Sequence, residues 1–114
     1  MTTYFGFALA DSMFTGNCQI SRVELGIVSA KVVVRDAVAC LNPSHAATIA
    51  AMRERFGIEI AIPESPPKVS LGSGDAILVM GVRGLPRLTD RHEYTHAEIE
   101  SATFSFALYR IDAE

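Results

Sequence analysis

The sequence is poor in cysteine and contains no long apolar run. Cys18 and Cys40 are the only cysteines among 114 residues. They lack the close spacing of metal-ligand pairs, so we expect two reduced structural thiols in a cytoplasmic protein. No stretch approaches the roughly twenty apolar residues that a membrane-spanning helix needs. No cluster of cysteine, histidine or carboxylate residues indicates a metal site, and we expect no cofactor.

The sequence also has little positive charge. Its net charge is −3 and its calculated pI is near 5.6, which argues against broad binding to duplex nucleic acid but is compatible with a small anionic ligand. The length predicts one domain over residues 1–114. Apolar residues make up 49% of the chain and the mean hydropathy is +0.25, so we expect a surface committed to a second copy in a two-fold dimer.

The hydrophobic pattern predicts an α/β (α+β) fold, with a mixed central sheet of about five strands flanked by helices. Residues 76–82 form the most apolar run, which is typical of a strand buried on both faces. Residues 31–34 and 37–41 are predicted to pair as a hairpin, whereas residues 24–30 fit a helix or a strand. Further strands are expected at 3–9, 18–23, 68–71 and 103–111.

A helix is predicted from the stretch after Leu41 to about Phe56. Asn42 is a good N-cap, Pro43 suits the first helical position, and Gly57 is a natural terminator. A second, short helix is predicted where Thr95 and Glu98 have the spacing of a capping box.

His45 lies in the predicted first turn of the longer helix, with Thr48 one turn later on nearly the same face. The first turn of a helix presents free N–H groups and a positive dipole end, which favour an anion. An imidazole beside such a site indicates chemistry on a phosphate ester. The ordinary alternative is a solvated histidine at the start of a surface helix.

The loop 83–93 is rich in charge and leaves the end of the predicted central strand, where open α/β sheets bind ligands. Its arginines are either ligand contacts or simply solvated charges. The turn 72–75 contains two glycines but lacks the spacing and the lysine of a phosphate-binding Walker loop, so we do not assign it to nucleotide binding.

Three short motifs resemble one known family. They are His45-Ala46-Ala47-Thr48 at a helix start, Gly74-Asp75 before the apolar strand, and Arg87-Leu88-Thr89-Asp90 after it. In this order and spacing they resemble the viral anti-CRISPR ring nucleases and their bacterial relatives, which degrade cyclic tetra-adenylate, the messenger of type III CRISPR defence. Together with the Thr95–Glu98 helix and the last strand, the resemblance covers most of residues 40–111.

The resemblance implies a metal-independent ring nuclease acting in a prokaryotic cell or a virus-infected prokaryotic host. A ribose 2′-hydroxyl would attack the adjacent phosphorus, His45 would protonate the leaving 5′-oxygen, and Arg87 would bind the phosphate. Asp90 would orient Arg87 or the imidazole. Ligand contacts would come from Ala10, Asp11, Ser12, Ser44, Thr48 and Arg83. A two-fold homodimer would enclose the ring, each subunit offering one His45 and one Arg87.

The sequence also departs from the family pattern. Residues 7–10 read Phe-Ala-Leu-Ala where the family tends to have Asn-Ala-Phe-Ser, Ser44 replaces a glycine, and Asp90 replaces a glutamate. These departures favour an alternative, in which a dimer binds or sequesters a cyclic oligonucleotide without cutting it. A third possibility is a structural subunit with no ligand.

Overall fold

The computed structural model describes residues 1–112 and confirms the predicted fold class, a mixed five-stranded sheet flanked by helices. The strand order is β2-β5-β4-β1-β3. The strands are β1 (Thr3–Gly6), β2 (Gln19–Leu25), β3 (Val38–Ala39), β4 (Ala76–Arg83) and β5 (Thr103–Asp112). The α-helices are α1 (Ile27–Asp36), α2 (Ala46–Phe56) and α3 (His96–Ser101), and 3-10 turns cover Asp11–Met13 (η1) and Pro43–His45 (η2).

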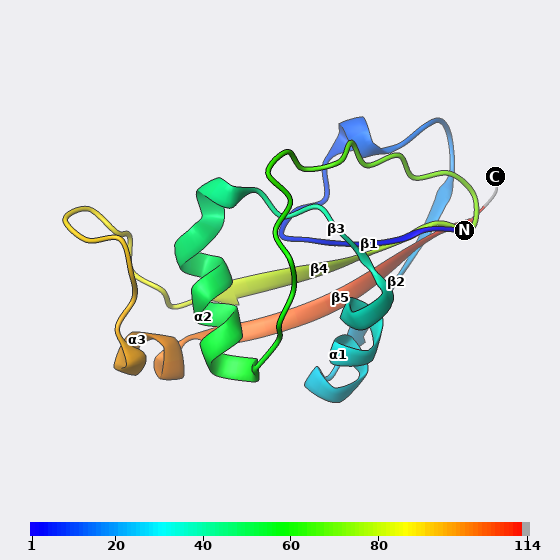
Figure 1. Ribbon diagram of the computed structural model, residues 1–114. Helices are drawn as coiled ribbons and strands as arrows, with labels where there is room; N and C mark the ends of the chain where they lie inside the picture. The colour runs from blue at the N-terminus through cyan, green and yellow to red at the C-terminus, as the bar shows by residue number, and fades with distance from the viewer. Residues whose placement is uncertain (113–114) are drawn as a thin grey trace.

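Strand direction places the carboxyl ends of four strands, β1 to β4, at one edge of the sheet. β1 runs parallel to β3 and β4, while β5 runs antiparallel to β4 and β2. The carboxyl ends of β1 and β4 therefore meet at the same edge, which is the usual ligand edge of an open α/β sheet. The start of α2 follows β3 and reaches this edge through η2 (Figure 1).

The two faces of the sheet are covered differently. One face packs against α1 and α2, where Ala30, Val34, Ile49 and Met52 meet Leu78 in the larger apolar cluster. The other face is covered by irregular chain from the η1 region and the segment before β4, including Met13, Phe14, Val69 and Leu71. β4 is buried on both faces, as its unbroken apolar sequence predicted.

The predicted hairpin of residues 31–34 and 37–41 is wrong. Residues 27–36 form helix α1, and only Val38 and Ala39 pair with β1. The run Val32–Val34 favours a strand by intrinsic propensity, but Ala30 and Val34 are buried one helical turn apart against the sheet. Tertiary packing outweighs a propensity difference of a few tenths of a kcal/mol per residue. The predicted strand 68–71 is also wrong, since Leu71 makes only an isolated bridge to Phe14.

The predicted helix ends are confirmed. The Asn42 side chain accepts a hydrogen bond from the Ser44 N–H at 2.9 Å, and Gly57 adopts a left-handed φ of 68° and donates to the Arg53 carbonyl. Thr95 and Glu98 form the reciprocal capping box of α3. The first predicted turn of α2 is a 3-10 turn, which makes His45 the N-cap of the α-helix.

α3 is fastened to α2 by two side chains. Arg55 Nη1 donates to the carbonyls of Ile99 and Glu100, both at 2.9 Å, and to that of Ala102 at 3.3 Å. These carbonyls lie at the end of α3, where the Ile99 carbonyl also accepts the Ala102 N–H at 3.3 Å, and a cation there complements the helix dipole. His96 pairs with a carboxylate of α2 at 2.9 Å. α3 therefore gives the loop 84–95 a fixed base.

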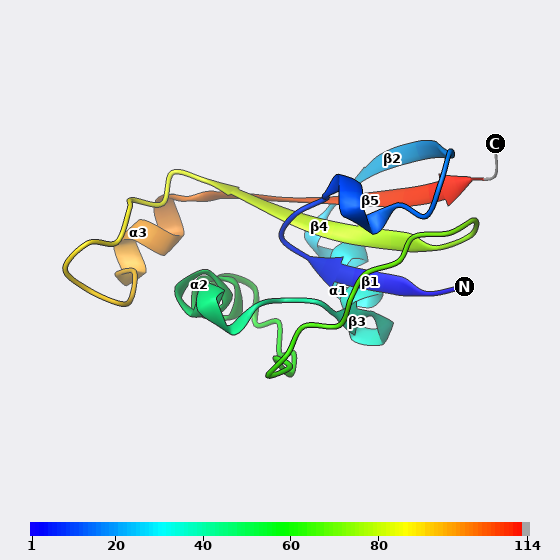
Figure 2. The same ribbon diagram turned by 90° about the horizontal axis from the view of Figure 1, so that it is seen from above.

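The molecule is elongated, with principal extents of 45 × 28 × 22 Å. Both views place the loop 84–95 and α3 at one end of the long axis, and the start of β1 and the end of β5 at the other (Figures 1 and 2). The loop projects beyond α2 and does not fold back over the start of that helix in either view. No helix of the described residues is long and apolar enough to span a membrane.

Candidate functional site

A hollow of about 480 Å³ lies at the carboxyl edge of the sheet, beside the start of α2. Its size falls within the usual range for small-molecule sites. His45 and Thr48 line it from α2, as their spacing predicted, and Phe7 and Ala8 line it from the end of β1. The end of β4 supplies the remaining wall through Met80, Gly81 and Val82.

The His45 imidazole lies against the ring of Phe7, with ring centroids 6.0 Å apart and planes tilted by 41°. Phe7 in turn makes an edge contact with the fully buried Phe5, at 6.2 Å between centroids. Packing against the buried Phe5 thus positions the Phe7 ring, and the Phe7 ring contacts the His45 imidazole. His45 makes no hydrogen bond to another described side chain and remains exposed, so its nitrogens are available to a ligand.

A smaller hollow of about 100 Å³ continues across the end of β1 and shares Phe7, Ala8 and His45 with the larger one. Cys40 lines it, and the Cys40 thiol donates to the Phe5 carbonyl at 3.2 Å. Burial raises the pKa of this thiol. A protonated, hydrogen-bonded thiol is a poor nucleophile, so Cys40 is not suited to thiolate chemistry.

Two groups of residues that were predicted to contact the ligand lie near the hollow but do not form its walls. Ala10, Asp11 and Ser12 lie at η1, and of this turn only the neighbouring Met13 reaches the smaller hollow. Ser44 lies in η2 directly before His45. Ser44 and Asp11 are exposed, which leaves their polar groups open to solvent beside the site.

Arg87 and Asp90 lie on the projecting loop 84–95 and line neither of these two hollows. Arg83 ends β4 and is exposed. Among the described residues, the walls of the larger hollow therefore hold one titratable group and no guanidinium. The described residues contain no group of three or more side chains suited to hold a metal ion.

The base of this loop is anchored by charge. Arg91 forms a bidentate ion pair with Glu98, with one hydrogen bond of 2.6 Å, and the Thr95 N–H donates to the same carboxylate at 2.8 Å. The Arg91 guanidinium and the Thr95 N–H lower the pKa of Glu98 to about 2. The loop is thus held near α3, while Arg87 and Asp90 lie outside this anchor.

Acid is expected to loosen this anchor. Because the folded pKa of Glu98 lies below its ordinary value near 4.5, its stabilising effect is complete above about pH 4.5 and is lost as the pH falls toward about 2. The protection factors of the α3 amides in wild type, which correct for the intrinsic pH dependence of exchange, should fall over this window. Glu98→Gln should exchange faster at neutral pH and respond less to acid. Glu100→Gln, on the same helix without a side-chain partner among the described residues, should behave as wild type.

The sequence did not identify Phe7, Met80 and Val82 as site residues. Phe7 was noted only as a departure from a family pattern, and the other two were assigned to the core. The available signal was their place at the carboxyl ends of two apolar strands, where side chains leave the core and reach the ligand edge.

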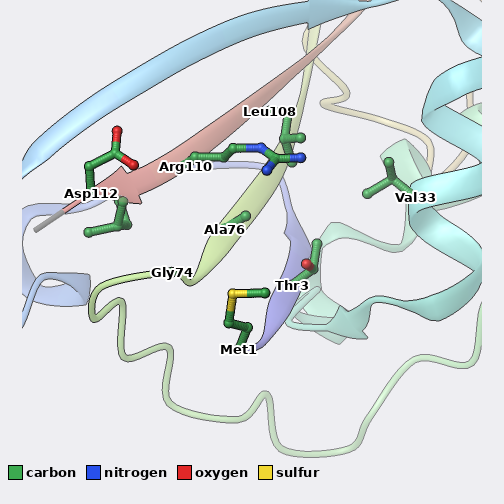
Figure 3. A pocket seen from close by; sticks show the side chains of 9 residues that line it. Met1, Thr3, Val33, Gly74, Ala76, Leu108, Arg110 and Asp112 are labelled. Carbon is green, nitrogen blue, oxygen red and sulfur yellow. The ribbon is translucent and has the colours of Figure 1, made fainter.

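A third hollow, of about 270 Å³, lies at the opposite end of the sheet (Figure 3). Met1, Thr3 and Ala76 line it, and the Arg110 side chain lies across it. No residue predicted to bind a ligand reaches it. The turn 72–75 beside it has a structural role, because the Asp75 carboxylate accepts the N–H groups of Thr2 at 2.8 Å and Gly72 at 2.9 Å.

Comparison with known proteins shows a shared fold. No protein-family model matches the sequence, and no curated protein is similar to it in sequence. Among solved structures, the chain is similar to B116 of Sulfolobus turreted icosahedral virus, with a TM-score of 0.66 and 15% sequence identity. The likeness covers 96% of this chain and 99% of the viral one. The protein therefore has the fold of an archaeal-virus protein.

Proposed function

We propose that the protein is a metal-independent ring nuclease that cleaves cyclic tetra-adenylate and so counters or switches off type III CRISPR signalling. The observation that carries the proposal is the exposed His45 imidazole, held by Phe7 in a hollow of about 480 Å³ at the ligand edge of the sheet. The family motifs at residues 45–48, 74–75 and 87–90 support it. The viral protein with the same fold fits a viral setting.

The walls of the hollow suit a nucleotide. Phe7, Met80 and Val82 offer apolar and aromatic surface to a base, and stacking of a base on an aromatic side chain contributes about 1–3 kcal/mol. His45 and Thr48 place a proton donor and a hydroxyl at the edge of that surface, where the phosphodiester of the bound nucleotide would lie. One nucleotide of the ring would thus occupy each hollow.

The reaction follows from this placement. The ribose 2′-oxygen bonds to the adjacent phosphorus and gives up its proton to solvent water, and the bond from phosphorus to the 5′-oxygen breaks. Protonated His45 transfers its proton to the departing 5′-oxygen, which leaves a 2′,3′-cyclic phosphate and a 5′-hydroxyl. General acid catalysis of this kind contributes about 10²–10⁴-fold in rate. In-line positioning by the walls of the hollow contributes further.

The missing cation is supplied, in this proposal, by a second subunit. Arg87 lies on a loop that projects from the molecule and does not line its own hollow. A two-fold dimer that faces two hollows toward each other would bring Arg87 and Asp90 of each subunit to His45 of the other. A guanidinium binds phosphate in a bidentate geometry that a lysine does not reproduce.

The direct test is incubation of the purified protein with labelled cyclic tetra-adenylate, with and without a chelator, followed by denaturation and separation of products. Linear products carrying a 2′,3′-cyclic phosphate, formed equally with chelator, are expected. Intact ring recovered after denaturation would instead identify a protein that sequesters the messenger, a function favoured by the lack of a guanidinium in the walls of the hollow. Failure to bind the ring at all would refute both.

A further inference from the structure

We infer that β2 is an interface, at which a second copy of the chain adds its own β2 antiparallel and extends the sheet. β2 lies at one edge of the sheet, and its seven residues pair with β5 on one side only. The other edge strand, β3, has two residues. Among the described residues, β2 therefore presents the long open row of backbone N–H and C=O groups.

The β2 edge is regular enough to pair with another strand. Its register with β5 is continuous from Gln19 to Leu25, without a bulge or a proline. The large apolar side chains Ile20 and Val23 are 46% and 53% exposed. The Arg22 guanidinium donates to the Tyr109 hydroxyl at 3.1 Å and to Glu24 at 3.2 Å, so one cation and one carboxylate lie side by side on this strand.

The sequence of β2 favours one register with itself, because only that register pairs its opposite charges. Val23 and Leu25 face the α1 side of the sheet, opposite Leu108 and Phe106, while Arg22 and Glu24 face the other side. A two-fold axis perpendicular to the sheet keeps each face on its own side, so residues that oppose each other differ by an even number of positions. The axis must therefore lie midway between one residue and the same residue of the second copy, and the register is named after that residue.

Centring the axis on Val23 gives complementary pairs. Val23 then opposes Val23 of the second copy, and Arg22 of each copy opposes Glu24 of the other, which forms two opposite-charge pairs. Centring it on Arg22 would place like charges directly opposite, which destabilises an antiparallel pair. The observations therefore favour a second copy in the Val23-centred register over an unrelated strand.

This interface is separate from the one required by the proposed nuclease. β2 runs parallel to β4, because both are antiparallel to β5. The antiparallel β2 of the second copy thus points its carboxyl end the other way, and the two His45 hollows lie at opposite ends of the extended sheet. Pairing through β2 leaves each hollow open, and the inference holds whether or not the ring is cleaved.

Charge reversal tests the interface in the intact chain by sedimentation velocity over a range of concentrations. Arg22→Glu places a carboxylate opposite Glu24 in both of the symmetry-related pairs. We expect the dissociation constant of the β2 contact to rise about tenfold or more. Arg22→Glu with Glu24→Arg restores both opposing pairs and should restore association. A wild-type chain that stays monomeric, or association unaffected by Arg22→Glu, would overturn the inference.

Disulfide trapping tests the register. Val23→Cys places two thiols directly opposite, at about 4.5–5.5 Å between Cα atoms, which suits a disulfide. Ile20→Cys is the matched control, since it is exposed on the same strand but opposes residue 26. Val23→Cys should give a covalent dimer under mild oxidation, faster than Ile20→Cys and the wild-type chain with its two native cysteines. Equal rates for the two variants would exclude the Val23-centred register.

Discussion

His45→Ala is expected to lower the rate of cyclic tetra-adenylate cleavage by about 10²–10⁴-fold, the usual contribution of a general acid. Affinity for the ring should change little, because Phe7, Met80 and Val82 still line the hollow. Single-turnover kinetics and equilibrium binding separate these two effects. A loss carried mainly by binding would mean that His45 holds the ligand without donating a proton.

Two further variants make this result specific. His45→Gln keeps a polar side chain in the hollow but offers no transferable proton, so it should be as slow as His45→Ala. Added imidazole should recover part of the rate in His45→Ala, since the space left beside Phe7 matches the ring that was removed. His92→Ala, on the loop and outside both hollows, should cleave at the wild-type rate. Wild-type cleavage by His45→Ala would show that another group is the acid.

The elements predicted correctly from the sequence are those whose ends depend on local chemistry. Asn42, Gly57 and Thr95 each stabilise a helix end through bonds to residues within a few positions, so sequence spacing alone indicates them. The apolar run 76–82 is also local information, since a short apolar run bounded by a glycine-containing turn is typical of a strand buried on both faces. Helix α1 was missed because its helical state depends on packing of Ala30 and Val34 against the sheet.

The residues of the candidate site likewise differ in how far local sequence determines their relative positions. His45 and Thr48 are one turn apart, and helix geometry alone brings them to one hollow. Phe7 reaches the imidazole across a distance of 38 positions in the sequence, which only the parallel pairing of β1 with β3 determines. The relation of Arg87 to His45 is less local still, since in the proposed dimer it depends on a second subunit. The family resemblance therefore names both residues without stating that they meet.

Arg87→Ala is expected to reduce cleavage by about 10²–10³-fold, as the loss of one preorganised group that stabilises transition-state charge usually does. Arg87→Lys should recover little, because an ammonium does not bind a phosphate in two places. Arg110→Ala removes a guanidinium at the opposite end of the sheet and should leave the rate unchanged. Full activity in Arg87→Ala would remove Arg87 from the mechanism.

A mixture of inactive variants then shows which subunit supplies the guanidinium. In a dimer with sites completed across the two-fold axis, one His45→Ala subunit and one Arg87→Ala subunit share one intact site and one doubly defective site. Random exchange makes half of the dimers mixed, so activity should return to about a quarter of wild type. If each loop closed over its own hollow, every site would lack one group and no activity would return. The amount of recovered cleavage therefore distinguishes a site shared between subunits from one completed by movement of the loop 84–95.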